Sequence, residues 1–171
     1  MIRSAAAEDA ERLLEIYTYY VTDTAVSFEI DVPSPDAFRA RIERTLDHDP
    51  YLVVEENGAV LGYAYAGPFK ERAAYDHCRE VTVYLDRGAR GRGLGKALYG
   101  ALEEELKKRG VKNLYACIAS PIGEDEYLTN DSEKFHRRMG YALAGTFHRC
   151  GFKFHRWYDM IWMEKLIGEE N

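Results

Sequence analysis

The chain has 171 residues, of which 46% are hydrophobic and 30% charged, with a formal net charge of −6. This length favours one domain that is stable without a disulfide or a structural metal. The negative charge does not favour a nucleic-acid partner. No apolar run is long enough to span a membrane. The first residues are too acidic for a signal peptide, so we expect a cytoplasmic protein.

The N-terminal half predicts two helices followed by a β-hairpin. Ser34 before Pro35 is typical of a helix start, since serine caps the first turn and proline fits its first position. Asn57-Gly58 is typical of a tight hairpin turn. The expected elements are a strand at residues 2–4, a helix from residue 7 to 21, a helix from 35 to 46, and strands at 51–55 and 59–66.

The C-terminal half predicts a strand, a long helix and a mixture of further elements. Residues 80–85 alternate, with Val81, Val83 and Leu85 expected on one face and Glu80, Thr82 and Tyr84 on the other. Gly110 and Gly140 are expected to end helices. The other elements are a helix at 94–109, a strand at 114–118, a loop at 119–130, a helix at 132–139, and strands at 141–147 and 152–163. Together they predict one mixed α/β (α+β) domain with a largely antiparallel sheet.

Cysteine number and spacing indicate thiols rather than disulfides or a metal site. Cys78, Cys117 and Cys150 are an odd number at wide spacings, and no zinc pattern is present. We expect each to be a reduced thiol that fills buried space.

Residues 87–100, RGARGRGLGKALYG, place a glycine-rich basic turn between a strand and a helix. The first N–H groups of a helix lack intrahelical partners and favour an anion such as phosphate. The P-loop pattern fails, because Ala97 stands where Ser or Thr is needed and Arg90 where glycine is needed. The dinucleotide pattern fails because Lys96 replaces its third glycine. By itself the turn could also be a solvated basic loop.

A third pattern fits. Arg90, Gly93 and Gly95 satisfy R-x-x-G-x-G, which resembles the acetyl-CoA pyrophosphate loop of the GNAT acetyltransferase superfamily. Further stretches resemble the phosphinothricin and methionine-sulfoximine N-acetyltransferases within it. They are TAVSFEIDVPSP (24–35), YAGPFKERAAYD (65–76), EVTVYL (80–85), FHRRMGY (135–141) and GFKFHRWYDMIWM (151–163). The resemblance covers nearly the whole chain and implies the GNAT fold.

The resemblance implies an acetyl-CoA site and no metal. The family usually has Asn and Ser three residues apart before its last helix, but Thr129 holds the asparagine position here and Asn130 comes one residue late. Whether Thr129 or Asn130 contacts the cofactor is therefore open. The implied cofactor residues are Val83, Tyr84, Leu85, Arg90, Gly91, Arg92, Gly93, Leu94, Gly95, Lys96, Asn130 and Ser132.

Two residues are candidates for catalysis. Glu80 is the candidate base, because a carboxylate with a modestly raised pKa could deprotonate an amine of pKa about 8. The alternative is a surface glutamate beside Arg79. His136 stands where relatives place Tyr or His near the departing sulfur, so it could protonate the thiolate. The alternative is a histidine at the edge of the core.

The acceptor is expected to be a small amine. Arg72 is the best candidate to bind a carboxylate, since a guanidinium makes a paired planar contact. The alternative for Lys70-Glu71-Arg72 is a solvated charged loop. The residues implied for the acceptor are Phe28, Lys70, Glu71, Arg72, Glu80, Val81 and Thr82.

The combined hypothesis is an acetyl-CoA-dependent N-acetyltransferase for an amino-acid-like amine of the phosphinothricin or methionine-sulfoximine type. We expect direct transfer in a ternary complex, since no cysteine has a nucleophile's surroundings. The alternatives are a polyamine, an antibiotic or a protein N-terminus as acceptor, or a CoA-binding sensor without turnover. The family resemblance and the aromatic stretch 152–162 also predict a homodimer.

Overall fold

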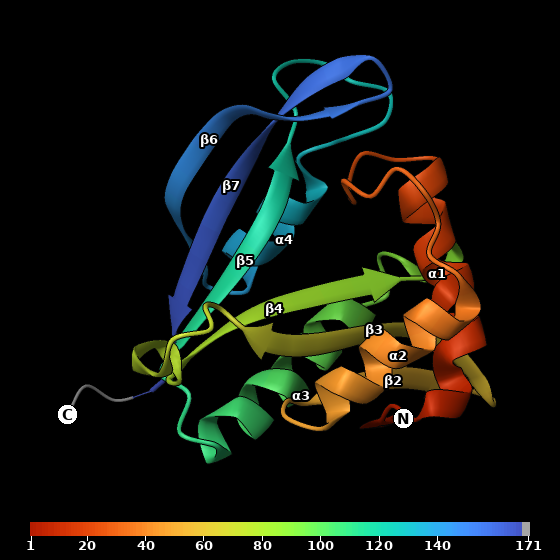
Figure 1. Cartoon of the computed structure of the whole chain (residues 1–171), viewed down its shortest axis with the longest axis vertical. Helices are drawn as coiled ribbons and strands as arrows, with labels where there is room; N and C mark the ends of the chain where they lie inside the picture. The colour runs from red at the N-terminus through yellow and green to blue at the C-terminus, as the bar shows by residue number, and fades with distance from the viewer. Residues whose placement is uncertain (169–171) are drawn as a thin grey trace.

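The computed structural model describes residues 1–168 as one seven-stranded sheet with helices on both faces (Figure 1). The strand order is β1-β2-β3-β4-β5-β7-β6, and every neighbouring pair is antiparallel except β4–β5. The single-domain α/β prediction is therefore confirmed. The strands are β1 (Ile2–Ser4), β2 (Tyr51–Glu56), β3 (Ala59–Pro68), β4 (Cys78–Leu85), β5 (Asn113–Ser120), β6 (Ala142–Lys153) and β7 (Arg156–Leu166).

The helices begin and end where short-range signals place them. The Ser34 hydroxyl accepts a hydrogen bond from the Ala37 N–H at 3.2 Å and caps α2. Gly110 and Gly140 have φ of +80° and +90° just after the helices they end. The helices are α1 (Ala10–Thr22), α2 (Pro35–Leu46), α3 (Leu94–Lys108) and α4 (Asp131–Arg138), with short 3₁₀ turns at Ala7–Asp9, Ala73–Tyr75 and Arg87–Ala89.

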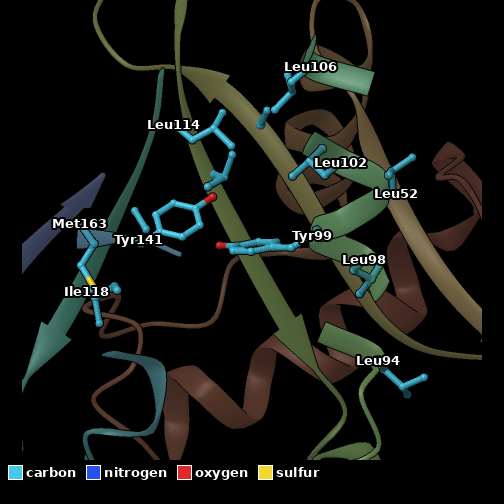
Figure 2. Close-up of a cluster of buried hydrophobic side chains, with 14 of the residues drawn as sticks. Leu52, Leu94, Leu98, Tyr99, Leu102, Leu106, Leu114, Ile118, Tyr141 and Met163 are labelled. Atoms are coloured by element: carbon cyan, nitrogen blue, oxygen red, sulfur yellow. The ribbon is translucent and has the colours of Figure 1, made fainter. Parts of the chain in front are cut away.

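Strand alternation divides the interior into two cores. On one face, Leu52 and Val54 of β2 pack with α3, and Figure 2 shows this core around Leu98, Leu102 and Tyr99. On the other face, Val53 packs with α1 and α2. Burying each leucine of α3 contributes about 1.5–3 kcal/mol, which holds the start of this helix firmly against the sheet. The predicted two faces of β4 are confirmed, since Val81 belongs to the α3 core and Tyr84 packs against the other.

The sheet opens into a wedge between β4 and β5. β4 pairs with β3 from Arg79 to Leu85 but with β5 only from Cys78 to Glu80. Beyond Glu80 the two strands diverge, as Figure 1 shows. The edge of β4 from Val81 to Leu85 therefore faces β5 without a strand partner. Its backbone groups can bind a ligand, except the Leu85 carbonyl, which accepts a hydrogen bond from the Tyr20 hydroxyl.

The sequence misplaced the last turn of the chain. β6 continues to Lys153, and the turn to β7 lies at Phe154 and His155, which have φ of +51° and +58°. Residues 148–151, which lay between the two predicted strands, instead belong to β6 and form a bulge within it. Arg149 has φ of +50° there, and its N–H donates to Asp159 at 2.8 Å.

All three cysteines are free thiols as expected, but the expectation that they fill buried space was wrong. Cys117 and Cys150 are exposed and Cys78 is half-buried. Cys117 alternates with the buried Ala116 and Ile118 of β5, so it points to the other face of the sheet.

Candidate active site

A cavity of about 370 Å³ occupies the wedge between β4 and β5. Residues from β4, β5, the start of α3 and the start of α4 line it. The predicted site residues that line it are Val81, Thr82, Val83, Tyr84, Leu85, Arg90, Gly91, Gly95, Ser132 and His136. Those that do not are Glu80, Arg92, Gly93, Leu94, Lys96 and Asn130, together with Phe28, Lys70, Glu71 and Arg72.

The glycine-rich turn depends on backbone conformations that favour glycine. Gly91 and Gly93 have φ of +75° and +80°. Gly95 serves a different purpose, because an added Cβ would lie 3.2 Å from the Phe135 ring of α4. Because Gly95 has no Cβ, α3 and α4 can approach each other at this point. Asp86 accepts the Gly88 N–H at 2.8 Å and fixes the start of the turn.

The first turn of α3 is free to bind an anion. Gly93 occupies the cap position of this helix, and no side chain caps it. The first N–H groups therefore lack side-chain partners and lie at the positive end of the helix dipole. This is the arrangement expected of a phosphate site.

Arginines add positive charge at the turn. Arg90 stacks on Tyr20, with its guanidinium 5.2 Å from the ring centroid. Arg92 forms an ion pair with Glu56. Lys96 is exposed at the start of α3. Arg138 of α4 also lines the cavity, and sequence reasoning missed it because nothing distinguishes it locally from the neighbouring arginine.

The structure at the start of α4 distinguishes Thr129 from Asn130 as the residue that faces the cavity. Thr129 lines the cavity, whereas Asn130 is exposed at the cap position of α4 and does not. Ser132 lines it as expected.

Glu80 lies at the fork, where β4 and β5 separate. It pairs with Gly67 on one side and with Tyr115 on the other. The side chain is half-buried, and burial raises its pKa, while the charge of Lys70 acts in the opposite direction. A carboxylate with a raised pKa beside a ligand cavity suits a general base.

His136 is buried, with 4% of its surface exposed, and both ring nitrogens have partners. Nδ1 lies 2.7 Å from the Ser132 carbonyl, so we assign the ring hydrogen to Nδ1. Nε2, 2.9 Å from the Tyr99 hydroxyl, then accepts its hydrogen. Burial lowers the His136 pKa, which favours the neutral ring. Its role as an acid stays a prediction, and Tyr99, which also lines the cavity, was missed.

Lys70, Glu71 and Arg72 lie on the exposed loop after β3 and line a separate hollow outside the wedge cavity. Phe69 anchors this loop. Its ring stacks on Tyr115 with centroids 4.3 Å apart and meets Trp162 edge-on at 5.5 Å. The loop therefore begins next to the strand that pairs with Glu80.

The segment after α1 packs against the β6–β7 hairpin. An added Cβ on Gly151 would lie 2.4 Å from the Phe28 ring, so only glycine fits beneath it. The buried Lys153 donates to the Ser27 carbonyl at 2.7 Å. The Gly-Phe-Lys sequence at 151–153 thus has a structural purpose, which is to hold residues 27 and 28 in place.

Comparison with known proteins identifies the family. A family model described as the acetyltransferase (GNAT) domain matches residues 2–162. The chain belongs to the GNAT acetyltransferase family. It is 35% identical to a phosphinothricin N-acetyltransferase of Streptomyces viridochromogenes, over 93% of this chain and 83% of that protein. It is 31% identical to an L-methionine sulfoximine/L-methionine sulfone acetyltransferase of Salmonella typhimurium, over 98% and 95%.

A solved structure supports the fold of this GNAT chain. The phosphinothricin acetyltransferase of Sinorhizobium meliloti in complex with AcCoA superposes with a TM-score of 0.89 and 34% identity, covering 98% of this chain and 88% of that one. Within residues 1–168, no group of three or more His, Cys, Asp or Glu side chains could hold a metal ion. No helix in the same range could cross a membrane.

Proposed function

We propose that this GNAT protein transfers the acetyl group of acetyl-CoA to the amine of a small amino-acid-like molecule. The observation that carries the proposal is the wedge at Glu80. It joins a glycine-rich anion site, a free strand edge and a carboxylate of raised pKa. Relatives named for phosphinothricin and methionine sulfoximine support an acceptor of that type.

The residues of the wedge fit acetyl-CoA. The pyrophosphate would bind the free N–H groups at the start of α3, with positive charge from Arg90. The pantetheine arm, which carries amide groups, would hydrogen-bond the unpaired edge of β4 beyond Glu80. The apolar stretch of the cavity at Ala116 and Ile118 suits the methylene groups.

The chemistry balances with residues of this chain. The amine nitrogen attacks the thioester carbonyl, and its proton passes to Glu80, directly or through one water. A backbone N–H on the open edge of β4 would stabilise the oxyanion. The C–S bond then breaks, the thiolate leaves and takes up a proton from water, and Glu80 returns its proton to solvent. A thiol pKa near 8.5 makes this departure possible without a strong acid.

Direct transfer fits better than an acetyl-enzyme intermediate. Cys117 lines the cavity and is the thiol nearest to such a role. Although Cys117 is exposed at the cavity, partial desolvation of its sulfur and the charge of Glu80 raise its pKa to about 12. A thiol with that pKa is a poor nucleophile at neutral pH.

The test is release of coenzyme A thiol from acetyl-CoA with a panel of amines. We expect methionine sulfoximine or phosphinothricin to support turnover. Turnover only with a polyamine, an antibiotic or a peptide N-terminus would contradict the acceptor and keep the transferase. Acetyl-CoA binding without thiol release from any amine would favour the sensor.

We also propose a cytoplasmic homodimer. β6 is an edge strand, and Phe147 and Phe152 on it are each more than half exposed, as is Trp157 on the neighbouring β7. A long apolar edge strand invites pairing with another chain. Light scattering at micromolar concentration should give twice the mass of one chain, and the mass of one chain would contradict the dimer.

A further inference from the structure

A second cavity, of about 210 Å³, lies on the α1–α2 side of the sheet. We call it the tyrosine cavity, because five tyrosines from α1, β2, β3 and β4 line it, and α2 adds two arginines. An engineered cavity of about 150 Å³ binds benzene, so this one has room for a benzene-sized group with a polar substituent. The tyrosines are Tyr17, Tyr51, Tyr63, Tyr65 and Tyr84, and the arginines are Arg41 and Arg44.

Three of these tyrosines have hydroxyls without a partner. Among residues 1–168, Tyr51, Tyr63 and Tyr84 make no hydrogen bond through the hydroxyl. Tyr63 is only 1% exposed and Tyr51 only 4%. None of these three hydroxyl oxygens is completely buried, so each of them reaches water through the cavity. Three hydroxyls that line one cavity without a protein partner are therefore available as donors to a ligand that enters it.

The charge of the cavity is positive. Glu29 accepts two hydrogen bonds from Arg41, at 2.9 and 2.6 Å, and a third from the Tyr17 hydroxyl. The Glu29 and Arg41 charges therefore offset each other. Arg44 has no ion pair within the described residues, so it leaves one uncompensated positive charge at the cavity. Hydroxyl and guanidinium donors together select an oxygen acceptor, above all an anionic one.

The tyrosine cavity adjoins the proposed transfer site. Tyr84 lines both cavities. Tyr65 pairs with Thr82 across β3 and β4, two residues from Glu80. A molecule with its amine at Glu80 could therefore extend along this face of β4 into the tyrosine cavity.

We propose that the tyrosine cavity is the subsite for the far end of the acetyl acceptor. It binds a group up to the size of a substituted benzene ring that ends in an anionic oxygen, such as a carboxylate. This inference rests on the proposed acetyl transfer, since it assigns the part of the acceptor remote from the reacting amine.

The probe is benzoate, titrated into the full chain and followed by NMR or calorimetry. We expect Tyr63→Phe to weaken benzoate binding roughly tenfold, the effect of losing one hydrogen bond to a charged group. Arg44→Gln should weaken it about two- to fivefold, as for an exposed charge. Arg39→Gln is the matched control, because this exposed arginine of the same helix does not line the cavity. Tyr51→Phe replaces Tyr63→Phe if that variant does not fold.

Steady-state inhibition then places the subsite. Benzoate should compete with the acceptor amine and not with acetyl-CoA. Equal benzoate affinity in wild type and in both cavity variants would overturn the proposal, as would inhibition that is not competitive with the acceptor. The titration needs no turnover, so failure of the subsite and failure of acetyl transfer give separate results.

Discussion

The two sides of the wedge are assembled from the chain in different ways. The side proposed for acetyl-CoA takes its backbone donors from β4, the turn after it and the first turn of α3, which are consecutive in sequence, and β5 and α4 complete its cavity. The side proposed for the acceptor combines Glu80, the loop after β3 and the tyrosine cavity, which draw on two helices and on the three strands β2, β3 and β4. Backbone groups dominate the first side and side chains the second. The first can therefore hold one ligand with few residue requirements, while the second sets specificity.

Replacing the base should have the largest effect, because it should lower turnover strongly and leave acetyl-CoA binding nearly unchanged. Glu80→Gln removes the group that takes the amine proton, and we expect kcat to fall by about 10²- to 10⁴-fold. The dissociation constant for acetyl-CoA should stay within about twofold, because Glu80 does not line the wedge cavity. Stopped-flow or steady-state thiol release, with calorimetry, measures both.

Glu164→Gln is the matched control for that change. Glu164 lies in the same row of the sheet, paired with Tyr115, which in turn pairs with Glu80. It should keep near wild-type kcat. An unaltered kcat in Glu80→Gln would show that Glu80 is not the general base.

A change in the exposed loop should affect only acceptors that carry a carboxylate. Arg72→Lys loses the paired planar contact, so we expect kcat/KM for methionine sulfoximine to fall roughly ten- to a hundredfold. The decarboxylated amine analogue should be scarcely affected. An equal loss for both compounds would show that Arg72 does not bind the carboxylate, and it would favour a polyamine or peptide acceptor.

The pH profile should report the surroundings of Glu80. Burial raises its pKa and the charge of Lys70 partly offsets that effect. The base acts when deprotonated, so activity rises with pH as Glu80 loses its proton. Lys70→Met removes the offset, and the acid limb of kcat/KM should move to higher pH. Lys108→Met, on the last turn of α3, should leave it in place. A limb that does not move, or moves to lower pH, would contradict this coupling.

What the sequence predicted follows the same division between the two sides. The cap at Ser34, the hairpin at Asn57-Gly58 and the turn around Gly93 depend on neighbours within a few residues, and their patterns are visible in the chain. Alternation in β4 was equally local. These elements were placed within a few residues of their observed ends.

The remaining features depend on contacts between distant segments. The bulge at Arg149 depends on a hydrogen bond to Asp159 of the next strand. Because local sequence does not reveal that contact, the residues around Arg149 were not recognised as part of a strand. The tyrosines of the second cavity looked like ordinary core residues, because only the fold brings them to one cavity. Arg138 and Thr129 likewise gained meaning only once α4 was placed beside the wedge.

The most direct test of the central claim is one calorimetric titration of acetyl-CoA into wild type, Gly93→Ala and Gly58→Ala. Gly93 and Gly58 have φ of +80° and +79°, and an added Cβ at either would meet no atom within 4 Å. Each substitution should therefore lower the stability of the protein by a similar amount, about 1–2 kcal/mol, through backbone strain. Only Gly93 lies at the proposed pyrophosphate turn, while Gly58 lies in the β2–β3 hairpin. We predict that acetyl-CoA affinity falls roughly tenfold in Gly93→Ala and stays at the wild-type value in Gly58→Ala. Equal affinity in all three proteins would contradict the claim that this turn binds acetyl-CoA.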